Sequence, residues 1–404
     1  MSDAQKATAA TAILQHLEAN DLSSALATLE APASAPPLAT ETPSAAAFDA
    51  LFAALKQFGD RATALDEQIR EVEAELEMHL LWLPNLPHAS TPVGASDADN
   101  IAHPAQGAFR PFDFTPLPHW ELGPQLDLID FERGVKLAGS RFYLLKHQGA
   151  RLLRALINWM LDEHATAGFQ EIYVPYLVKA EALYGAAQFP KFREVVYFDA
   201  ESELYMLPTS EVALTNIFRD EILEESDLPL YLMSHTPCFR REKMSAGRDV
   251  RGIKRGHQFE KVEMYKFTTP ETSYDELESL TRQAEQVCAR LEIPYRRLEI
   301  VTGDLGFAAT KKYDLEMYAP GCDEWLEVSS CSNTEDFQAR RANLRYRPSD
   351  GGKPRYVHTL NGSGLGMSRV LIAVMENYQQ ADGSVRVPAV LVPYMGGLQV
   401  IEPR

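Results

Sequence analysis

The spacing of apolar residues predicts helices and strands along most of the chain after residue 100. Residues 149–168 repeat apolar positions every three or four residues, which predicts an amphipathic helix, and residues 171–178 read as extended. A glycine-rich turn followed by a helix is expected over 361–379. Short apolar and aromatic runs predict strands at 204–208, 230–235, 261–268, 295–302 and 325–330. Because strands outnumber crossover helices, the pattern favours an α+β fold, an antiparallel sheet flanked by helices.

A different pattern marks residues 46–80. Apolar side chains step by three and four along a single narrow stripe, which is typical of a coiled coil. The stripe consists of Phe48, Leu51, Leu55, Phe58, Ala62, Leu65, Ile69, Val72, Leu76 and Leu80. A helix of this length would measure about 52 Å at 1.5 Å per residue. Residues 3–30 also read as helical, so the pattern favours an antiparallel helical hairpin over one long helix packed on the body of the protein.

The predicted organisation is therefore an N-terminal arm and one large domain. Residues 31–47 hold four prolines and are expected to be a flexible Pro/Ala-rich linker within the arm. Residues 82–96 are rich in Pro, Ser and Gly, as a domain boundary is. We expect the arm to cover residues 1–83 and the large domain residues 84–404.

Composition and charge narrow the possible functions. The chain has 404 residues, 45% hydrophobic and 24% charged, which excludes wholesale disorder. No apolar run is long enough to span a membrane. The N-terminus lacks the pattern of a signal peptide, and the four cysteines form no C-x-x-C pair, so a reducing, cytoplasmic compartment is expected. The net charge of -18 makes the chain a poor general binder of nucleic acid.

The strongest candidate for chemistry is a basic cluster between two predicted strands. Guanidinium groups bind phosphate through two hydrogen bonds, so a loop that concentrates them could hold a polyphosphate. The cluster consists of Arg240, Arg241, Lys243, Arg248, Arg251, Lys254 and Arg255. Phe259 could offer a face to a base, and Glu242 and Glu263 could bind a cation or an amine. The alternative is a solvated, charge-balanced hairpin tip.

A glycine-rich segment precedes the last predicted helix. Gly362, Gly364 and Gly366 stand just before Arg369. Glycines let a backbone approach a ligand closely, and a helix N-terminus favours anions. Many glycine-rich turns are only structural, and this one lacks the usual dinucleotide-binding pattern.

Two further segments carry side chains that suit a small polar substrate or a cation. Glu327 lies three residues before Ser330, and carboxylates of this kind can bind magnesium beside a nucleotide. Thr209 and Glu211 could bind the ammonium and hydroxyl groups of a substrate. The alternatives are a solvated glutamate in a strand and an ordinary helix cap.

In these segments the chain resembles the class II aminoacyl-tRNA synthetases, and specifically the bacterial type of seryl-tRNA synthetase. The resemblance runs from residues 84–88 to the C-terminus. Motif 1 ends at Pro175, motif 2 runs from Phe239 through Glu263, and motif 3 runs from Gly362 to Arg369. Residues typical of seryl-tRNA synthetases also occur at 119–123, 129–134, 140–146 and 337–341. The resemblance implies the class II antiparallel sheet and a homodimer built on the region around Pro175.

The resemblance also implies a role for each site residue. Arg240, Arg255, Arg369 and Glu327 would be catalytic. Serine would be bound by Thr209, Ser210, Glu211, Arg240, Glu263, Asn361 and Ser363. ATP would be bound by Arg240, Arg241, Glu242, Arg255, Gly256, Phe259, Glu327, Val328, Ser329, Ser330 and Arg369. Magnesium would be held by Glu327 and Ser330. The implied reaction activates L-serine with ATP to seryl-adenylate and transfers the seryl group to tRNA-Ser, without a protein nucleophile.

The N-terminal arm departs from the family. The family's arm is rich in Lys and Arg and grips tRNA, whereas residues 1–85 here hold 4 Lys and Arg against 13 Asp and Glu. Three hypotheses follow. The chain is a serine–tRNA ligase with an adapted arm, or it activates serine for a non-tRNA acceptor, or it is a non-catalytic regulatory relative. The residues of the catalytic motifs favour the first hypothesis. A comparison of tRNA charging with ATP–pyrophosphate exchange separates the three hypotheses.

Overall fold

The structure is a computed structural model that describes residues 12, 45–243 and 251–403. The chain divides into two compact units, Met1–Leu81 and Trp82–Arg404. Within the described residues, no helix has both the length and the apolar character needed to cross a lipid bilayer. The four cysteines, all described, are unpaired.

The first unit is described through one long helix, α3 (Ala45–Leu80). It confirms the helix predicted from the apolar stripe, and its 36 residues span about 54 Å. Apart from Ala12, the predicted partner segment at residues 3–30 lies outside the described residues, so the hairpin stays a prediction. Because α3 begins at Ala45, the last three residues of the predicted linker belong to this helix, and the rest of the linker is not described.

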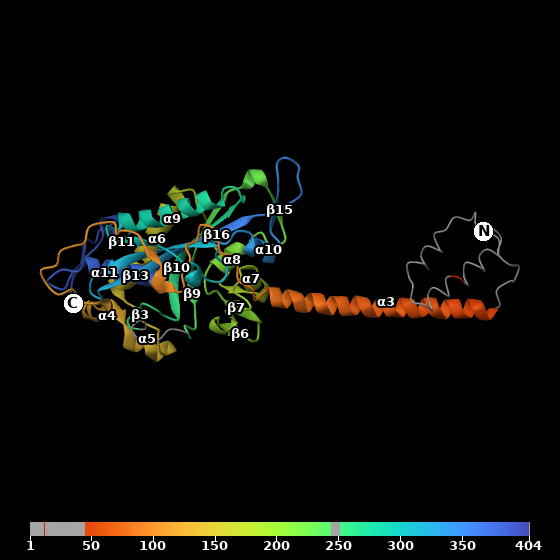
Figure 1. Ribbon diagram of the computed structural model, residues 1–404. Coiled ribbons are helices and arrows are strands. Elements are labelled where there is room, and N and C mark those ends of the chain that lie inside the picture. The colour runs from red at the N-terminus through yellow and green to blue at the C-terminus, as the bar shows by residue number, and fades with distance from the viewer. Residues whose placement is uncertain (1–11, 13–44, 244–250, 404) are drawn as a thin grey trace. The chain divides into compact units, whose positions relative to one another are not determined.

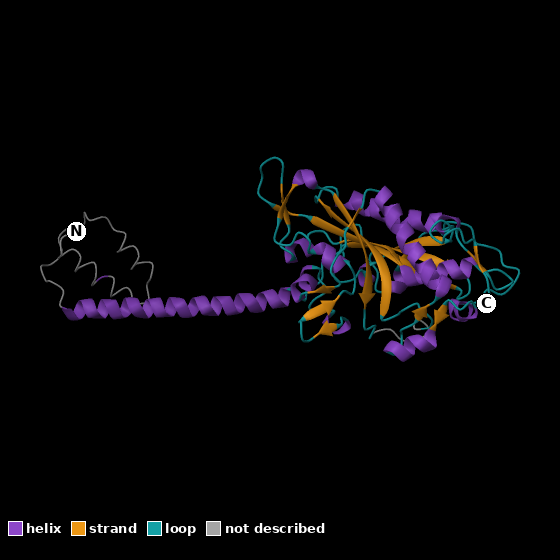
Figure 2. Cartoon of the chain, turned by 180° about the vertical axis from the view of Figure 1, so that it is seen from behind, coloured by secondary structure: helices purple, strands orange, loops and turns teal. Residues whose placement is uncertain are grey.

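The second unit is built on an eight-stranded sheet, seen at the centre of Figure 2. All neighbouring strands are antiparallel except the edge pair β4 and β9. In spatial order the strands are β1 (Ile101–Ala102), β11 (Tyr295–Glu299), β12 (Lys311–Ala319), β13 (Glu324–Asn333), β16 (His358–Gly366), β10 (Gln258–Thr268), β9 (Leu230–Phe239) and β4 (Gln170–Glu171). The predicted α+β fold is confirmed.

Helices surround this sheet (Figure 1). They are α4 (His119–Gln125), α5 (Phe131–Ala138), α6 (His147–Thr166), α7 (Ala180–Gly185), α8 (Glu211–Thr215), α9 (Ser273–Arg290), α10 (Phe337–Arg341) and α11 (Met367–Tyr378). Helix α9 packs on β13 and β16, and α11 contacts β10, β12, β13, α4 and α6. Helix α6 confirms the helix predicted over 149–168.

Short strands form four small sheets around the central one. They are β5 (Leu177–Val178) with β7 (Leu204–Met206) and β6 (Phe198–Asp199); β8 (Ile222–Glu224) with β14 (Arg345–Arg347) and β15 (Arg355–Tyr356); β2 (Ile129–Asp130) with β3 (Leu144–Leu145); and β17 (Val385–Arg386) with β18 (Val400–Ile401). The single extended run expected over 171–178 is wrong in detail. It contains only the last residue of β4 and the two residues of β5, with Pro175 between them, because proline cannot donate to a strand ladder.

The two faces of β10 divide the core from the site. Val262 and Met264 are fully buried in the main apolar core, which α6, α9 and α11 share. Lys261 and Glu263 alternate with them and therefore point to the opposite face. The strand thus uses its apolar positions to fix the sheet on its helices, and its polar positions to line a cavity.

The glycines before α11 differ from expectation. They lie in strand β16 and not in a turn, and α11 begins only at Met367. A Cβ atom on Gly362 would lie 3.1 Å from the side chains of Cys331 and Leu280, and one on Gly364 would lie 2.5 Å from His164 Nε2. These glycines therefore let the strand lie close against its neighbours and the helices behind it.

Candidate active site

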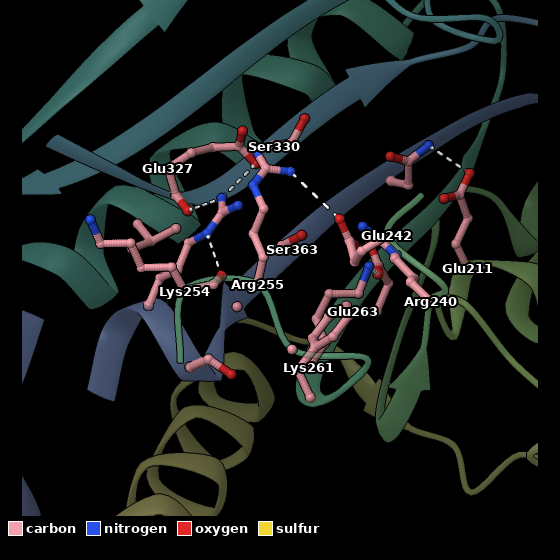
Figure 3. A pocket seen from close by; sticks show the side chains of 17 residues that line it. Glu211, Arg240, Glu242, Lys254, Arg255, Lys261, Glu263, Glu327, Ser330 and Ser363 are labelled. Carbon is pink, nitrogen blue, oxygen red and sulfur yellow. Dashed lines mark hydrogen bonds and ion pairs between the residues drawn. The ribbon is translucent and has the colours of Figure 1, made fainter. Parts of the chain in front are cut away.

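A cavity of about 330 Å³ opens where β9, β10, β13, β16 and the start of α11 meet (Figure 3). Its lining carries five basic and four acidic side chains. The lining residues are Glu211, Arg240, Glu242, Lys254, Arg255, Gly256, Phe259, Lys261, Glu263, Glu327, Val328, Ser330, Asn361, Ser363, Gly366, Ser368 and Arg369. In Figure 3, Lys254 and Glu327 mark one end of the cavity and Glu211 marks the other, with Arg240 between Glu211 and Arg255.

The first end is held by two arginines from different parts of the chain. Arg369, in the first turn of α11, donates from Nη1 to the Glu327 carbonyl oxygen at 2.7 Å, and Glu327 Oε1 lies 3.4 Å from the same nitrogen. Arg255 Nη1 lies 3.8 Å from Glu242 Oε2. The structure therefore brings both guanidinium groups and the Glu327 carboxylate to one end of the cavity, where an anion with several charges would find matching donors.

The second end holds buried carboxylates. Glu263, 2% exposed, accepts a hydrogen bond from Thr209 Oγ1 at 2.9 Å and forms an ion pair with Lys261. Lys261 also donates to Thr209 Oγ1 at 2.7 Å. Asn361 Nδ2 donates to Glu211 Oε1 at 3.1 Å. Two carboxylates, a hydroxyl and an amide thus converge at a place where a compact ammonium group could bind.

The Glu211 carboxyl group has an unusual affinity for protons. Burial, followed by the nearby charge of Glu263, raises the pKa of Glu211 to about 7, although Lys261, Gln338 and Arg240 oppose the change. Gln338 Nε2 donates to the same Glu211 oxygen at 2.6 Å. A cationic ligand at this end would favour the ionised carboxylate and release the proton.

Arg240 lies between the two ends of the cavity. Its Nε donates to the Pro208 carbonyl oxygen at 3.1 Å, and its guanidinium carbon lies 5.1 Å from the centre of the Phe259 ring. These contacts fix the plane of the guanidinium group directly after the end of β9. Arg240 can therefore reach a ligand that extends between the acidic end and the basic end.

Most of the predicted site residues line this one cavity, but four do not. Thr209, 3% exposed, lies behind Glu263, and Ser210 is fully buried at the start of α8. Ser329 donates to the Ser363 carbonyl oxygen at 2.6 Å. Arg241 donates to the Val196 carbonyl oxygen at 3.3 Å and lies over the Tyr197 ring. Of the basic cluster, Arg248 lies outside the described residues.

Two lining residues were missed by the sequence reasoning. Lys261 precedes Glu263 by two positions on β10, so strand alternation alone could have placed it on the same face. Ser368 lines the cavity from the first turn of α11 and lies 3.0 Å from the Tyr143 hydroxyl oxygen. No comparable signal marks Ser368, because only the packing of α11 turns it to the cavity.

The fold and the cavity define a class II aminoacyl-tRNA synthetase core. Residues 194–378 match the family described as the tRNA synthetase class II core domain (G, H, P, S and T). This span includes β9, β10, β13, β16 and α11, and every residue that lines the cavity.

Comparison with individual proteins narrows this class. The chain is 61% identical to the serine–tRNA ligase of Roseiflexus sp. (strain RS-1) over 88% of its length and 84% of that protein. It is 57% identical to the serine–tRNA ligase of Thermomicrobium roseum over 87% of its length and 80% of that protein. The seryl-tRNA synthetase of Pyrococcus horikoshii complexed with ATP superposes with a TM-score of 0.84, at 38% identity over 88% of this chain and 83% of that one. The chain belongs to the serine–tRNA ligase family.

Proposed function

We propose that this protein activates L-serine with ATP and transfers the seryl group to tRNA-Ser. The observation that carries this proposal is the meeting of Arg240, Arg255 and Arg369 in one cavity with the buried carboxylates Glu211 and Glu263. A triphosphate fits the basic end and an amino acid fits the acidic end. Residues 84–404 form the catalytic domain in this proposal, and residues 1–83 form the arm.

The geometry suits an in-line attack of the serine carboxylate on the α-phosphorus of ATP. Glu211 and Glu263 hold the ammonium group, and Arg240 holds the serine carboxylate and the α-phosphate. Arg255 and Arg369 bind the β- and γ-phosphates, which leave as pyrophosphate. Because the guanidinium groups are in place before the reaction, they stabilise the negative charge that develops on the phosphate oxygens. The mixed anhydride that remains is seryl-adenylate, which the terminal ribose hydroxyl of tRNA attacks.

The nucleotide base and the serine hydroxyl have partners of their own in this arrangement. Phe259 offers a ring face to adenine. Glu242 either recognises the base or orders the loop between β9 and β10 to which Glu242 belongs. Asn361 and Ser363 lie on the cavity face of β16, near the serine side chain. A site that hydrogen-bonds the serine hydroxyl disfavours alanine, because binding alanine leaves buried polar groups without partners.

Magnesium is the cofactor that this site would hold. Glu327 and Ser330 offer hard oxygen ligands at the basic end of the cavity. Asp314, which pairs with Ser330 across β12 and β13, is 5% exposed, and its Oδ1 has no hydrogen-bond partner among the described residues. These groups fit a hydrated divalent cation, which supplies charge neutralisation of the phosphates when it is bound.

Two reactions of the purified chain test the proposal. We expect serine-dependent ATP–pyrophosphate exchange and serine charging of tRNA-Ser. Exchange without charging would show that the protein activates serine for an acceptor other than tRNA. Loss of both reactions would identify a non-catalytic relative. Alanine in place of serine is the matched control, because it differs only by the hydroxyl group.

The pKa of Glu211 predicts the pH dependence of serine binding. Glu211 is about half protonated near pH 7 in the empty site, and only its ionised form attracts the ammonium group. We therefore expect KM for serine in the exchange reaction to fall about tenfold between pH 6 and pH 8. The Glu211→Gln variant, which cannot titrate at this position, should lose this step. An unchanged step in that variant would assign it to another group.

The acidic arm predicts weak, weakly salt-dependent binding of tRNA. Helix α3 exposes Glu67 and Glu71 one turn apart. If the arm faces tRNA phosphates, Glu67→Lys with Glu71→Lys should lower KM for tRNA-Ser and steepen its salt dependence by a slope of about 2. The Glu67→Gln with Glu71→Gln variant removes the negative charges without adding positive ones, so it separates the loss of repulsion from tRNA phosphates from the gain of new phosphate contacts. ATP–pyrophosphate exchange should stay unchanged in both double variants. If neither double variant changed tRNA charging, tRNA would not bind along this part of α3.

A homodimer is part of the proposal. Tyr173, Leu177 and Phe198 expose large apolar side chains around the end of motif 1, with Tyr173 85% exposed. Such a surface suits burial against a second copy of the chain.

A further inference from the structure

A buried histidine and glutamate join three segments behind the basic end of the cavity. His119, in the first turn of α4, and Glu376, near the end of α11, are both fully buried. His119 Nδ1 lies 2.9 Å from Glu376 Oε1, which also accepts the His119 backbone N–H at 2.8 Å. The other oxygen, Oε2, accepts the backbone N–H of Cys322 at 3.0 Å. One carboxylate therefore ties α11 to α4 and to the turn between β12 and β13.

The opposite edge of the imidazole ring holds the end of the motif 2 loop. His119 Nε2 accepts the backbone N–H of Ile253 at 3.1 Å. Gly252 lies against the ring so closely that a Cβ atom would be 2.0 Å from Nε2, and its φ of +71° also favours glycine. The next residue of α4, Trp120, lies under the guanidinium carbon of Arg251 at 4.5 Å and under Lys254 Nζ at 5.5 Å. Two adjacent side chains of α4 thus clamp residues 251–254.

The hydrogen bonds of His119 favour a proton and not a metal ion on Nδ1, although His119, Cys322 and Glu376 bring their ligand atoms within 4.8 Å of one another. Because Nε2 accepts a hydrogen bond from Ile253, the proton of the neutral ring is on Nδ1, where it is donated to Glu376. A metal on Nδ1 would have to displace that proton. Burial lowers the pKa of His119, which keeps the ring neutral and this arrangement in place.

The clamped segment leads directly to the phosphate-binding groups. Arg255 follows Lys254, whose carbonyl oxygen accepts a hydrogen bond from Arg369 Nε at 3.5 Å. Arg369 and Glu376 share α11, and Cys322 stands two residues before the start of β13, which carries Glu327. The His119–Glu376 pair therefore connects the three elements that carry the basic end of the cavity.

We propose that His119 is a positioning residue that sets the end of the motif 2 loop against α11, so that Arg255 and Arg369 face the same triphosphate. This inference rests on the proposed function, because it takes the role of the two arginines from there. It predicts a larger effect on the β- and γ-phosphates than on the base, since Phe259 and the serine end form no hydrogen bond with His119 among the described residues.

The test compares His119→Phe with a control at the C-cap of α11, the helix that carries Glu376. Phenylalanine keeps a ring but removes the acceptor for Ile253. Gln379, 3% exposed, holds the Leu117 backbone through both amide atoms, at 2.8 Å and 3.0 Å, and its side chain forms no hydrogen bond with residues 251–255 among the described residues. Gln379→Leu therefore breaks a comparable buried anchor of the segment before α4. We expect His119→Phe to weaken ATP binding in calorimetry about tenfold or more, and AMP binding less than about twofold. Gln379→Leu should change neither the affinity for ATP nor the affinity for AMP.

The outcomes separate this inference from the proposed function. Equal loss of ATP and AMP affinity in His119→Phe, or the same pattern in Gln379→Leu, would overturn the positioning role. If His119→Phe does not fold, Trp120→Leu carries the test, because it removes the platform under Arg251 and Lys254 and leaves the buried pair intact. Unchanged ATP affinity in Trp120→Leu would then overturn the inference. Unchanged ATP affinity in Arg255→Ala would instead overturn the proposed function.

Discussion

Arg240→Ala should abolish serine-dependent ATP–pyrophosphate exchange. The Arg240 guanidinium group is fixed by Pro208 and Phe259 at the junction of the two ends of the cavity, where the serine carboxylate meets the α-phosphate in the proposed reaction. Its loss removes both the alignment of the nucleophile and the charge that stabilises the reacting phosphate. We expect a fall of at least about 10³-fold in kcat/KM, or about 4 kcal/mol.

A second arginine gives the control for this prediction. Arg355, in β15, pairs with Glu271 at 2.8 Å and is half exposed away from the cavity. Arg355→Ala should keep exchange near the level of the unchanged protein. Near-normal exchange in Arg240→Ala would refute the role assigned to Arg240 and with it the proposed reaction geometry.

Glu263→Gln should raise KM for serine by at least about 100-fold, because the ammonium group loses its most deeply buried partner. It should also destabilise the fold. Lys261 and Glu263 are 8% and 2% exposed at their side chains, and removal of one member of such a pair leaves the other charge buried alone. We expect the free energy of unfolding to fall by about 3–5 kcal/mol.

The double variant Lys261→Met with Glu263→Gln separates these two effects. Removal of both charges should restore most of the stability in urea unfolding, because no unpaired charge remains buried. It should not restore serine affinity, because the ammonium group still lacks its carboxylate. Recovery of a normal KM for serine in the double variant would show that Glu263 acts only through Lys261, contrary to the proposed ammonium site.

The sequence predicts this fold well wherever local pattern determines structure. Regular spacing of apolar residues identified α3 and α6, and short apolar and aromatic runs identified β7, β9, β10, β11 and β13. The segment 361–366 was misread because glycines signal turns in general. Here the neighbouring residues Leu280 and His164, which are distant in sequence, make glycine necessary within a strand. Information of that kind lies in tertiary packing, and no local pattern contains it.

The candidate site shows the same division. Motif wording indicated Arg240, Arg255, Arg369, Glu211 and Glu263, and the structure brings all five to one cavity. The motif sequences could not separate the side chains that line the cavity from neighbouring side chains that support it. Arg241 and Ser329 adjoin lining residues in sequence, yet their side chains donate to the backbone carbonyl oxygens of Val196 and Ser363. Which side chain faces a ligand depends on how each strand is twisted and packed.

The absence of side chains at Gly362 and Gly364 has a consequence for the amino-acid pocket. Asn361 and Ser363 project from the same strand to the opposite face, so the depth of the pocket floor depends on how closely β16 lies on Leu280 and His164 behind it. A methyl group added at the rear would push that floor forward and shrink the space for a substrate side chain. The selection of a small amino acid is thus governed partly by residues that never meet it.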